Sequence, residues 1–531
     1  MNFNALFHLL QVSQSQPSLA RHAVENHLTP IVEEDGLDAI TTASSPPVRP
    51  AMLHTNSVPF DNNNLKIVLN GVPASSLPVE NGKLPPTAVV FDEEDLVLDE
   101  NGTILGGSLR ALIKRLIPKR DYCPDKQFIF AFLLNARMFV APADLLHQIL
   151  QHCMFEQNAA QENFKKERRT RFFLNILKLC KEWTETFPYD FTTDSMMERL
   201  KELLGLCSAD PSSQQHSETL LRNLSARLTK LERYERALMD IQKEVSIQIW
   251  PSDDFTGISL ICDSGAVVAH QLTHIELERL SMIDPEEFVY LLGKNLINRE
   301  NGLAKSLPAT RNIDHYVDWF NRLTYLVGTE VTKHVKKRHR VKIIEFFIDV
   351  AKECFNIGNF NSLMAIVAGL SLSGVARLKK TWNKVDKSKL QILQHQLDPS
   401  GNFTSYRSTL KAAVWRSEGA KNGSEKIVVP FFSLFLKDLL VMHEKCSKKL
   451  PNGHVNFAMF SHFASQMMQF VRWKRVECPF ERNSLLLQYI LTSCTFSEKA
   501  MQLASFECEA PEQTIEKEQH KRLKLELQWG R

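Results

Sequence analysis

The segment from Pro430 to Glu444 carries side chains whose spacing suits a contact surface. Its apolar residues recur at helical intervals, and Pro430 fits a first helical position because its missing N–H would be unpaired there anyway. Lys437, Leu440 and Glu444 follow at offsets of three and four, so a cation, a hydrocarbon side chain and a carboxylate point the same way. Such a trio is unusual in a core, although an apolar helix of this kind more often serves packing alone. Both interpretations stay open at this point.

Other patterns that could carry chemistry are incomplete. His270 and His274 are four residues apart but lack the glutamate of a zinc-protease helix. Gly293-Lys294 has no glycine five residues earlier, so no phosphate-binding loop is present, and Gly369 to Ser373 lacks the closing glycine of a nucleophile elbow. We expect no metal, no cofactor and no hydrolytic activity.

The residues after Glu444 predict a second helix that would position the first. Pro451-Asn452-Gly453 is turn punctuation, and Phe457, Phe460 and the apolar residues up to Val476 recur at intervals of three and four. The two segments together predict a helical hairpin.

Composition is that of an ordinary globular protein. Lysines and arginines exceed acidic residues by a net charge of +3, which argues against a nucleic-acid binder. No apolar run reaches membrane-spanning length, and the 10 cysteines are scattered without any Cys-x-x-Cys. We expect a cytoplasmic, intracellular protein without a transmembrane segment.

The chain divides into five stretches and is predicted to be all-α, because no strand pattern dominates anywhere. Residues 1–98 are rich in Pro, Ser, Asn and Thr and are expected to be disordered. Residues 99–205 predict a helical bundle module and 206–258 a linker with a connecting helix that docks on a neighbouring domain. Residues 259–510 form a large helical domain that includes the hairpin, and 511–531 are expected to be a frayed, charged tail.

Several sequence segments resemble the motifs of one known family and occur in the same order along the chain. The segment that starts at Val429 is similar to the hairpin of the Cdc25-homology domain of Ras-family guanine-nucleotide exchange factors. Further matching phrases begin at Ala269 and Arg311 and include Asn359-Phe360-Asn361 and Arg377 to Trp382; Phe132 to Leu146 and Trp183 to Phe191 resemble the N-terminal Ras-exchanger module. As a whole, the chain is most similar to the compact exchangers of the RasGEF-domain-containing family, member one group.

The resemblance implies a protein that catalyses nucleotide release without covalent chemistry, and so not an enzyme in the usual sense. Leu440 would crowd the Mg²⁺ position of a bound GTPase with hydrocarbon, and Glu444 would repel the α-phosphate. Phe431, Lys437, Arg311 and Met364 would lie in the GTPase contact surface, and Asn359, Asn361 and Ser371 would support the hairpin.

The resemblance also implies a partner, a Ras-family GTPase of the Rap branch, with any peripheral membrane recruitment made through that GTPase. One departure concerns Ser371, where the family often has asparagine; serine reaches less far, so we expect a weaker brace or one made by Ser373. This departure motivates an alternative, a non-catalytic GTPase-binding or adaptor scaffold. A helical scaffold unrelated to GTPases is a weaker third hypothesis.

A basic run from Lys333 to Arg340 is the last feature that suggests a partner. It could meet acidic lipid or nucleic acid, but it precedes an apolar helical segment, so a solvated helix end is the favoured interpretation.

Overall fold

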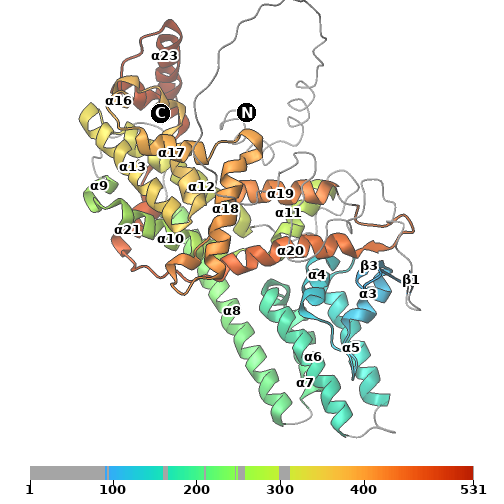
Figure 1. Cartoon of the computed structure of the whole chain (residues 1–531). Helices are drawn as coiled ribbons and strands as arrows, with labels where there is room; N and C mark the ends of the chain where they lie inside the picture. Colours follow the sequence, from blue (N-terminus) through green and yellow to red (C-terminus); the bar gives the residue numbers. More distant parts are fainter. Residues whose placement is uncertain are drawn as a thin grey trace, which may run out of the picture. The chain divides into compact units, whose positions relative to one another are not determined.

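The computed structural model describes residues 90–91, 95–159, 166–208, 211–244, 247–248, 257–297, 311–445 and 447–529, and the statements below concern these residues. Most of them are helical, which confirms the all-α prediction (Figure 1). Residues 1–89 of the stretch expected to be disordered lie outside this description. Among the described helices, none combines the length and the apolar character that crossing a bilayer requires.

The first half of the described chain forms a small sheet edge and a helical bundle. Its strands and helices are β1 (Val90–Phe91), β2 (Leu96–Leu98), β3 (Ile104–Gly107), α3 (Leu109–Leu116), α4 (Lys126–Ala136), α5 (Pro142–Ala159), α6 (Lys166–Thr186), η2 (Pro188–Phe191), α7 (Asp194–Cys207) and α8 (Pro211–Glu244).

The second half is the larger helical domain. It comprises β4 (Ile247–Gln248), α9 (Ile258–Ile261), α10 (Gly265–Met282), α11 (Pro285–Ile297), α12 (Arg311–Thr332), α13 (Lys337–Ile357), α14 (Phe360–Leu370), α15 (Ser373–Ala376), α16 (Lys379–Trp382), α17 (Ser388–Gln396), α18 (Ser400–Glu418), η4 (Ser424–Lys426), α19 (Phe432–Lys445), β5 (Val455–Asn456), α20 (Phe457–Lys474), α21 (Ser484–Thr492), β6 (Thr495–Phe496), α22 (Glu498–Cys508) and α23 (Thr514–Trp529).

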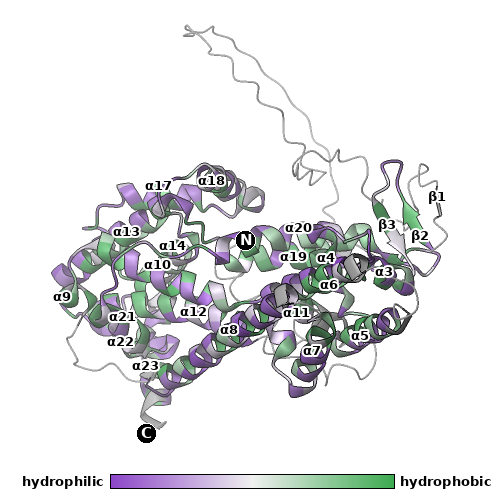
Figure 2. Cartoon of the chain, turned by 90° about the horizontal axis from the view of Figure 1, so that it is seen from below, coloured by the Kyte–Doolittle hydropathy of each residue, from purple (hydrophilic) through white to green (hydrophobic). Residues whose placement is uncertain are grey.

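The connecting helix α8 is amphipathic along its length. Leu220, Leu224, Leu231 and Leu238 are buried on one edge, whereas most charged residues of α8 are exposed. Figure 2 shows this alternation of hydrophobic and hydrophilic residues along the ribbon. The helix packs against α6 and α7, and Arg227 donates a hydrogen bond of 3.1 Å to the carbonyl of Ser281 at the end of α10. Helix α8 thus contacts both α6 and α7 and the end of α10.

A buried carboxylate organises the core of the larger domain. Glu276 of α10 accepts hydrogen bonds from Tyr316 and Trp319 of α12 and from Asn361 and Ser362 of α14. Burial raises the pKa of Glu276, and these donors oppose that rise. The network fixes the N-terminal end of α14, which faces the hairpin.

The small four-stranded sheet was not predicted. Its strands run in the order β1, β2, β3 and β5, all antiparallel, so a strand from the hairpin region completes a sheet begun before residue 99. This corrects the boundary of the stretch expected to be disordered, because β1 and β2 lie inside residues 1–98. The strands are too short to give a clear alternating pattern in the sequence.

The expected frayed tail also needs correction. Residues of this tail form α23, which contacts α22. Arg377 pairs with Glu516 at 3.2 Å, and the ring of His520 lies 5.0 Å from the ring of Phe506. The charged composition of the tail concealed these few anchoring contacts.

Candidate functional site

The structure confirms a helical hairpin made by α19 and α20. The connection between the arms turns at Gly453, whose φ of +84° favours glycine, and Lys449 and Val455 form an antiparallel bridge across it. The arms lie next to each other in Figure 1 and are in contact.

Two side chains from other helices hold the first turn of α19. The Tyr406 hydroxyl oxygen of α18 accepts a hydrogen bond of 2.7 Å from the N–H of Phe431, and Oδ1 of Asn361 accepts one of 3.3 Å from the N–H of Phe432. These N–H groups have no partner within a helix that starts here. The base of the hairpin is therefore capped by residues distant in the sequence.

Asn359 lies beside this cap. Its Oδ1 accepts from the N–H of Ser362 as the N-cap of α14, and its Nδ2 donates to Thr273 at 3.2 Å. The backbone pairs Asn359 with Val429 in a parallel bridge, immediately before the hairpin. Both predicted support asparagines thus lie at the hairpin base.

Ser371 lies elsewhere. It is the C-cap of α14, and its hydroxyl donates to the carbonyl of Val367 at 2.7 Å. Ser373 donates to Gln502 of α22 at 3.0 Å. Asn359 and Asn361, which bond the hairpin base, lie at the opposite end of the 11-residue helix α14, which is roughly 16 Å long. Ser371 and Ser373 therefore make no hydrogen bond to the hairpin among the described residues, and the side chains that bond its first turn are Asn361 and Tyr406.

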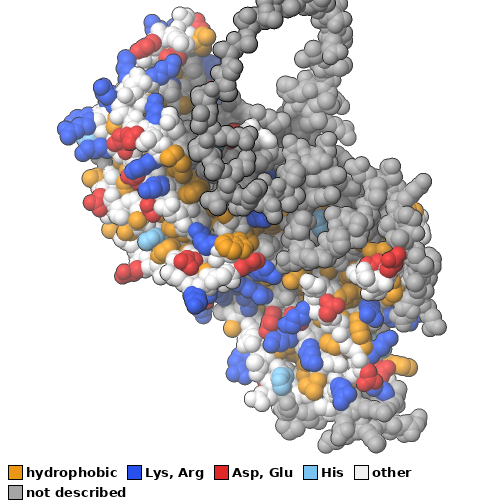
Figure 3. Space-filling model, in the orientation of Figure 1, with side chains coloured by type: hydrophobic (Ala, Val, Ile, Leu, Met, Phe, Trp, Pro, Cys, Tyr) orange, Lys and Arg blue, Asp and Glu red, His pale blue; other side chains and the backbone are white. Residues whose placement is uncertain are grey.

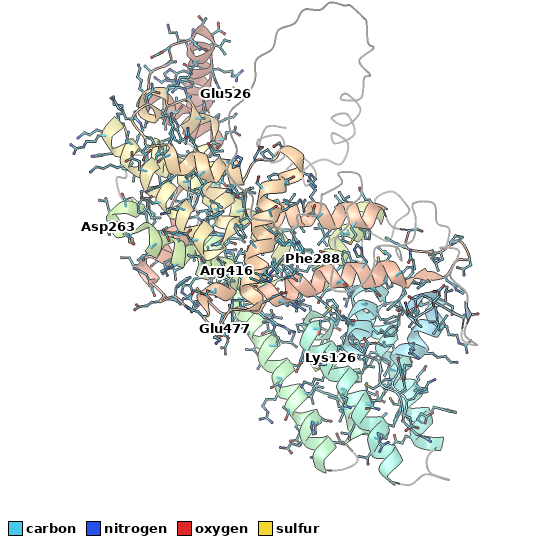
Figure 4. The ribbon with its side chains drawn as sticks, viewed as in Figure 1. Lys126, Asp263, Phe288, Arg416, Glu477 and Glu526 are labelled. Carbon is cyan, nitrogen blue, oxygen red and sulfur yellow. The ribbon has the colours of Figure 1, made fainter. Side chains whose placement is uncertain are left out.

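An aromatic cluster joins the two arms of the hairpin. Phe288 of α11, labelled in Figure 4, has its ring 4.9 Å from Phe470 of α20 and 5.8 Å from Phe435 of α19. Phe435 in turn lies 5.7 Å from Phe470 and 5.9 Å from Trp473. Such ring pairs add packing energy beyond the area they bury, so the cluster ties the two arms to each other and to α11.

The predicted trio on α19 is accessible. Glu444 is exposed and Lys437 and Leu440 are half-buried. Neither Lys437 nor Glu444 forms an ion pair with any residue that the structure describes. On the other side of the helix Asp438 is held by Arg407 in a bidentate pair with N–O distances of 2.7 and 2.8 Å. The trio therefore stays accessible on a helix that Arg407 holds through Asp438.

Two residues expected in the contact surface are not available to a partner. Phe431 is 4% exposed and packs near Phe320, Phe403 and Tyr406, and Met364 is 0% exposed within α14. Phe431 therefore packs at the hairpin base, and Met364 lies in the core of the larger domain. Arg311 is exposed at the start of α12, in keeping with a surface role.

The far end of the hairpin is held by the N-terminal module. Gly106 and Gly107 of β3 pair with Asn456 and Val455 of β5. A Cβ on Gly106 would lie 2.5 Å from Leu450 Cδ1 and 2.7 Å from the carbonyl oxygen of Val455, so only glycine allows this approach.

Helix α4 of the same module packs along α20 (Figure 1). The ring of Phe128 lies 4.9 Å from that of Phe457, and Nδ2 of Asn135 donates to the carbonyl of Phe460 at 3.4 Å. The module therefore contacts the first turn of the second arm.

A buried arginine connects the module to α11. The Arg137 guanidinium donates to both carboxylate oxygens of Asp190, at 2.9 and 3.2 Å, and to the hydroxyl of Tyr290 at 2.9 Å. Trp183 donates to the same carboxylate at 2.8 Å. The sequence analysis identifies the segments around Arg137 and Asp190 only by their resemblance to the family. It does not predict this pairing, because the two residues are 53 positions apart.

Among the described residues of α19, His443 is the one whose pKa is strongly shifted. It is 5% exposed, and neither ring nitrogen has a hydrogen-bond partner. Burial, with a smaller contribution from Lys448, lowers the pKa of His443 to about 4. The ring is neutral near pH 7.

Comparison with known proteins gives matches over both halves of the chain. Residues 103–203 match the RasGEF N-terminal motif and residues 267–461 match the RasGEF domain. The chain is 46% identical over 447 residues to Ras-GEF domain-containing family member 1B-A of Danio rerio, which covers 82% of this chain and 86% of that protein.

Two human proteins are similar to the same degree. Ras-GEF domain-containing family member 1B is 45% identical over 80% of this chain and 92% of its own length, and member 1C is 43% identical over 83% and 95%. The matched ranges contain the capped base of α19 and the module that holds α20. The chain therefore belongs to the Ras-GEF domain-containing family and carries both its N-terminal motif and its RasGEF domain.

Proposed function

We propose that this protein accelerates GDP release from a Ras-family GTPase, with the Rap branch as its first candidate substrate, by placing α19 at the nucleotide and Mg²⁺ site. The observation that carries the proposal is the accessible face of Lys437, Leu440 and Glu444 on a helix braced at both ends of its hairpin. The Rap branch enters through the likeness to the compact exchangers of this family. The proposal places the protein in the cytoplasm.

Nucleotide release by this mechanism breaks no covalent bond. A GTPase holds its nucleotide through phosphate-binding backbone groups and Mg²⁺. Leu440 offers hydrocarbon where the cation needs oxygen ligands, and the carboxylate of Glu444 repels phosphate and competes for the groups that bound it. A protein that binds the nucleotide-free GTPase more tightly must weaken nucleotide binding by the same factor.

Rigidity of α19 supports this mechanism. A flexible helix would deform when it meets the bound nucleotide and would not displace it. Helix α19 is held by Tyr406 and Asn361 at its base and by Arg407 at Asp438. The binding free energy can then act on the nucleotide site instead of on the hairpin.

The test is release of a fluorescent GDP analogue from a panel of Ras, Rap and Ral proteins by catalytic amounts of the full chain. Release should accelerate for one branch, and Leu440→Ala should lower the rate about 10- to 30-fold, because a buried leucine side chain contributes roughly 1.5–2 kcal/mol. Leu485→Ala is the matched control, since Leu485 is exposed on α21. It should release nucleotide like the parent protein.

A charge test uses Glu444→Gln, which keeps shape and removes the negative charge. We expect slower release, with the exposed Glu425→Gln of η4 as the unaffected control. Stable binding of nucleotide-free GTPase without acceleration for any branch would instead support the scaffold hypothesis. No binding to any member would support a helical scaffold unrelated to GTPases.

A further inference from the structure

A second charged surface lies on the larger domain, on elements other than the hairpin. Its members are exposed lysine and arginine side chains that form no ion pair with any described residue: Lys336, Lys337, Arg338 and Lys342 at the start of α13, and Lys379 and Lys384 in and after α16. We call this set the α13–α16 basic surface. In Figure 3, blue side chains are visible toward the upper left, where Figure 1 places α13 and α16, with red side chains among them.

A buried cluster holds the two basic segments together. Arg340, which is 1% exposed, donates from Nε to Thr381 of α16 at 3.0 Å and from Nη1 to the carbonyls of His334 and Val335. Glu509 pairs with Arg340 at 3.4 Å and accepts from the N–H and hydroxyl of Thr381. The carboxylate of Glu509 is thus paired with the buried Arg340. The Arg340–Thr381 hydrogen bond joins α13 to α16, so it also keeps the exposed bases of these two helices near one another.

The start of α13 is electrostatically unfavourable for its own helix. Lys336 is the N-cap and makes no side-chain capping bond, and the first turn holds no acidic residue. Positive charge at a helix N-terminus opposes the helix dipole, and neighbouring bases repel one another. Helix stability therefore does not explain this arrangement, whereas contact with an anionic surface does.

Neighbouring acids do not neutralise the surface. Glu512 pairs with Lys380, Asp349 with Lys389, and Glu516 with Arg377. Glu345 and Asp386 each accept a backbone N–H and keep their negative charges, so these two acids offset only part of the charge of the six bases. The bases of the α13–α16 basic surface remain in excess.

The chemistry of this surface fits lipid better than nucleic acid. Its bases come mostly from flexible lysines, and the nearby Trp382 is partly buried, with its indole N–H on the carbonyl of Val375, so no free ring is offered to a base. Val335 projects at the tip of the loop before α13 and is 62% exposed between His334 and Lys336. An exposed apolar residue followed directly by three bases matches the headgroup and acyl boundary of an anionic bilayer.

We propose that the α13–α16 basic surface binds directly to the anionic face of a lipid bilayer, with Val335 at its centre of contact. The interaction is electrostatic and is weakened by salt. It is independent of the proposed nucleotide exchange, because it requires neither a GTPase nor the hairpin. It would add a direct contact to any recruitment made through a GTPase.

The test is sedimentation of the full chain with vesicles of phosphatidylcholine alone or with phosphatidylserine added. The parent protein should bind only the anionic vesicles, and less at high salt. The triple variant Lys336→Glu, Lys337→Glu, Arg338→Glu should bind more than about 100-fold more weakly, since each base near such a surface contributes about five-fold. Val335→Asp should also weaken binding.

A matched control separates this surface from net charge. Lys411, Lys421 and Lys426 are exposed on α18 and near η4. Changing all three to Glu alters the net charge equally and should leave most vesicle binding intact. Thermal unfolding of each variant checks that it folds.

Three results would overturn the proposal. They are equal binding of the parent protein to neutral vesicles, parent-like binding by the α13 triple variant, and an equal loss in the control triple variant. Binding of the parent protein to a short RNA duplex but not to anionic vesicles, lost in the α13 triple variant, would assign the surface to nucleic acid instead.

Discussion

The hydroxyl oxygen of Tyr406 accepts a hydrogen bond of 2.7 Å from the backbone N–H of Phe431, so one side chain of α18 holds the first turn of α19. Tyr406→Phe removes this acceptor and leaves a buried N–H without a partner. Such a loss costs about 1–2 kcal/mol. We expect faster hydrogen exchange of the α19 amides and slower GDP release, measured on the same preparation.

The control for this prediction is Tyr325→Phe. Tyr325 is half-buried in α12, and its hydroxyl makes no hydrogen bond with the described residues. Its loss should change neither amide exchange in α19 nor nucleotide release. Unchanged protection of α19 in Tyr406→Phe would mean that Asn361 alone holds the first turn.

Gly106→Ala tests the attachment of the N-terminal module to the hairpin tip. The added methyl group would meet the backbone carbonyl of Val455 at 2.7 Å, and a backbone oxygen cannot rotate away as a side chain can. The β3–β5 pairing should open, with a loss of about 2–3 kcal/mol in the free energy of unfolding. Thermal unfolding measures this loss, and slower GDP release would show that the module supports the hairpin.

Gly205→Ala is the matched substitution for that experiment. Gly205 lies within α7, and a Cβ there meets nothing within 4 Å. Alanine should raise the free energy of unfolding by roughly 0.5–1 kcal/mol because it is the better helix former. Gly106→Ala with the stability of the parent protein would show that the strands can shift without loss.

Arg137→Lys tests the buried connection between the module and α11. A lysine cannot reach both oxygens of Asp190 and the hydroxyl of Tyr290, so buried groups lose their partners. We expect a loss of about 3 kcal/mol in thermal unfolding. Arg171→Lys is the control, because Arg171 forms only an exposed pair with Asp121 at 3.9 Å.

The double variant Arg137→Met with Asp190→Asn distinguishes charge from packing. It removes both buried charges, while the asparagine oxygen can still accept from Trp183. Much of the stability lost in Arg137→Lys should return. A double variant as unstable as the single one would mean that the guanidinium itself carries the contact.

The hairpin shows which parts of this site were predictable from sequence. Helical periodicity from Phe457 onward and the turn at Gly453 are local signals, and the structure has both. The contacts that fix the hairpin join Tyr406 to Phe431 and Gly106 to Asn456, and separations of that kind leave no local pattern. The family resemblance implied a supporting role for Asn361, whereas its hydrogen bond from the N–H of Phe432 joins residues 71 apart and leaves no local signal in the sequence.

Burial explains why other site residues differed from expectation. Phe431 and Met364 look like contact residues in a sequence, because an aromatic ring and a thioether suit interfaces as well as cores. The structure places both inside, and the rings that cover Phe431 come from α12 and α18, far from it in the sequence. The charged ends of Lys437 and Glu444 remain accessible, since charges without partners stay in water.

His443 gives a prediction about acid stability. Its pKa of about 4 in the folded protein lies below the usual 6.5, so the unfolded chain takes up a proton first as the pH falls. Its contribution is therefore fully present above about pH 6.5 and is lost as the pH falls toward 4. Glu287, whose pKa burial raises to about 7, contributes with the opposite sign, so variants must be compared with the parent protein.

His443→Met and His443→Gln separate titration from polarity at this buried position. Neither side chain titrates, so both should lose less stability than the parent protein between pH 6.5 and 4, by about 1–2 kcal/mol. Only methionine removes the two unpartnered nitrogens, so it alone should raise stability at pH 7, by about 1 kcal/mol. Denaturant unfolding across this pH range measures both effects. Curves for His443→Met that run parallel to those of the parent protein would show that the imidazole accepts its proton without cost.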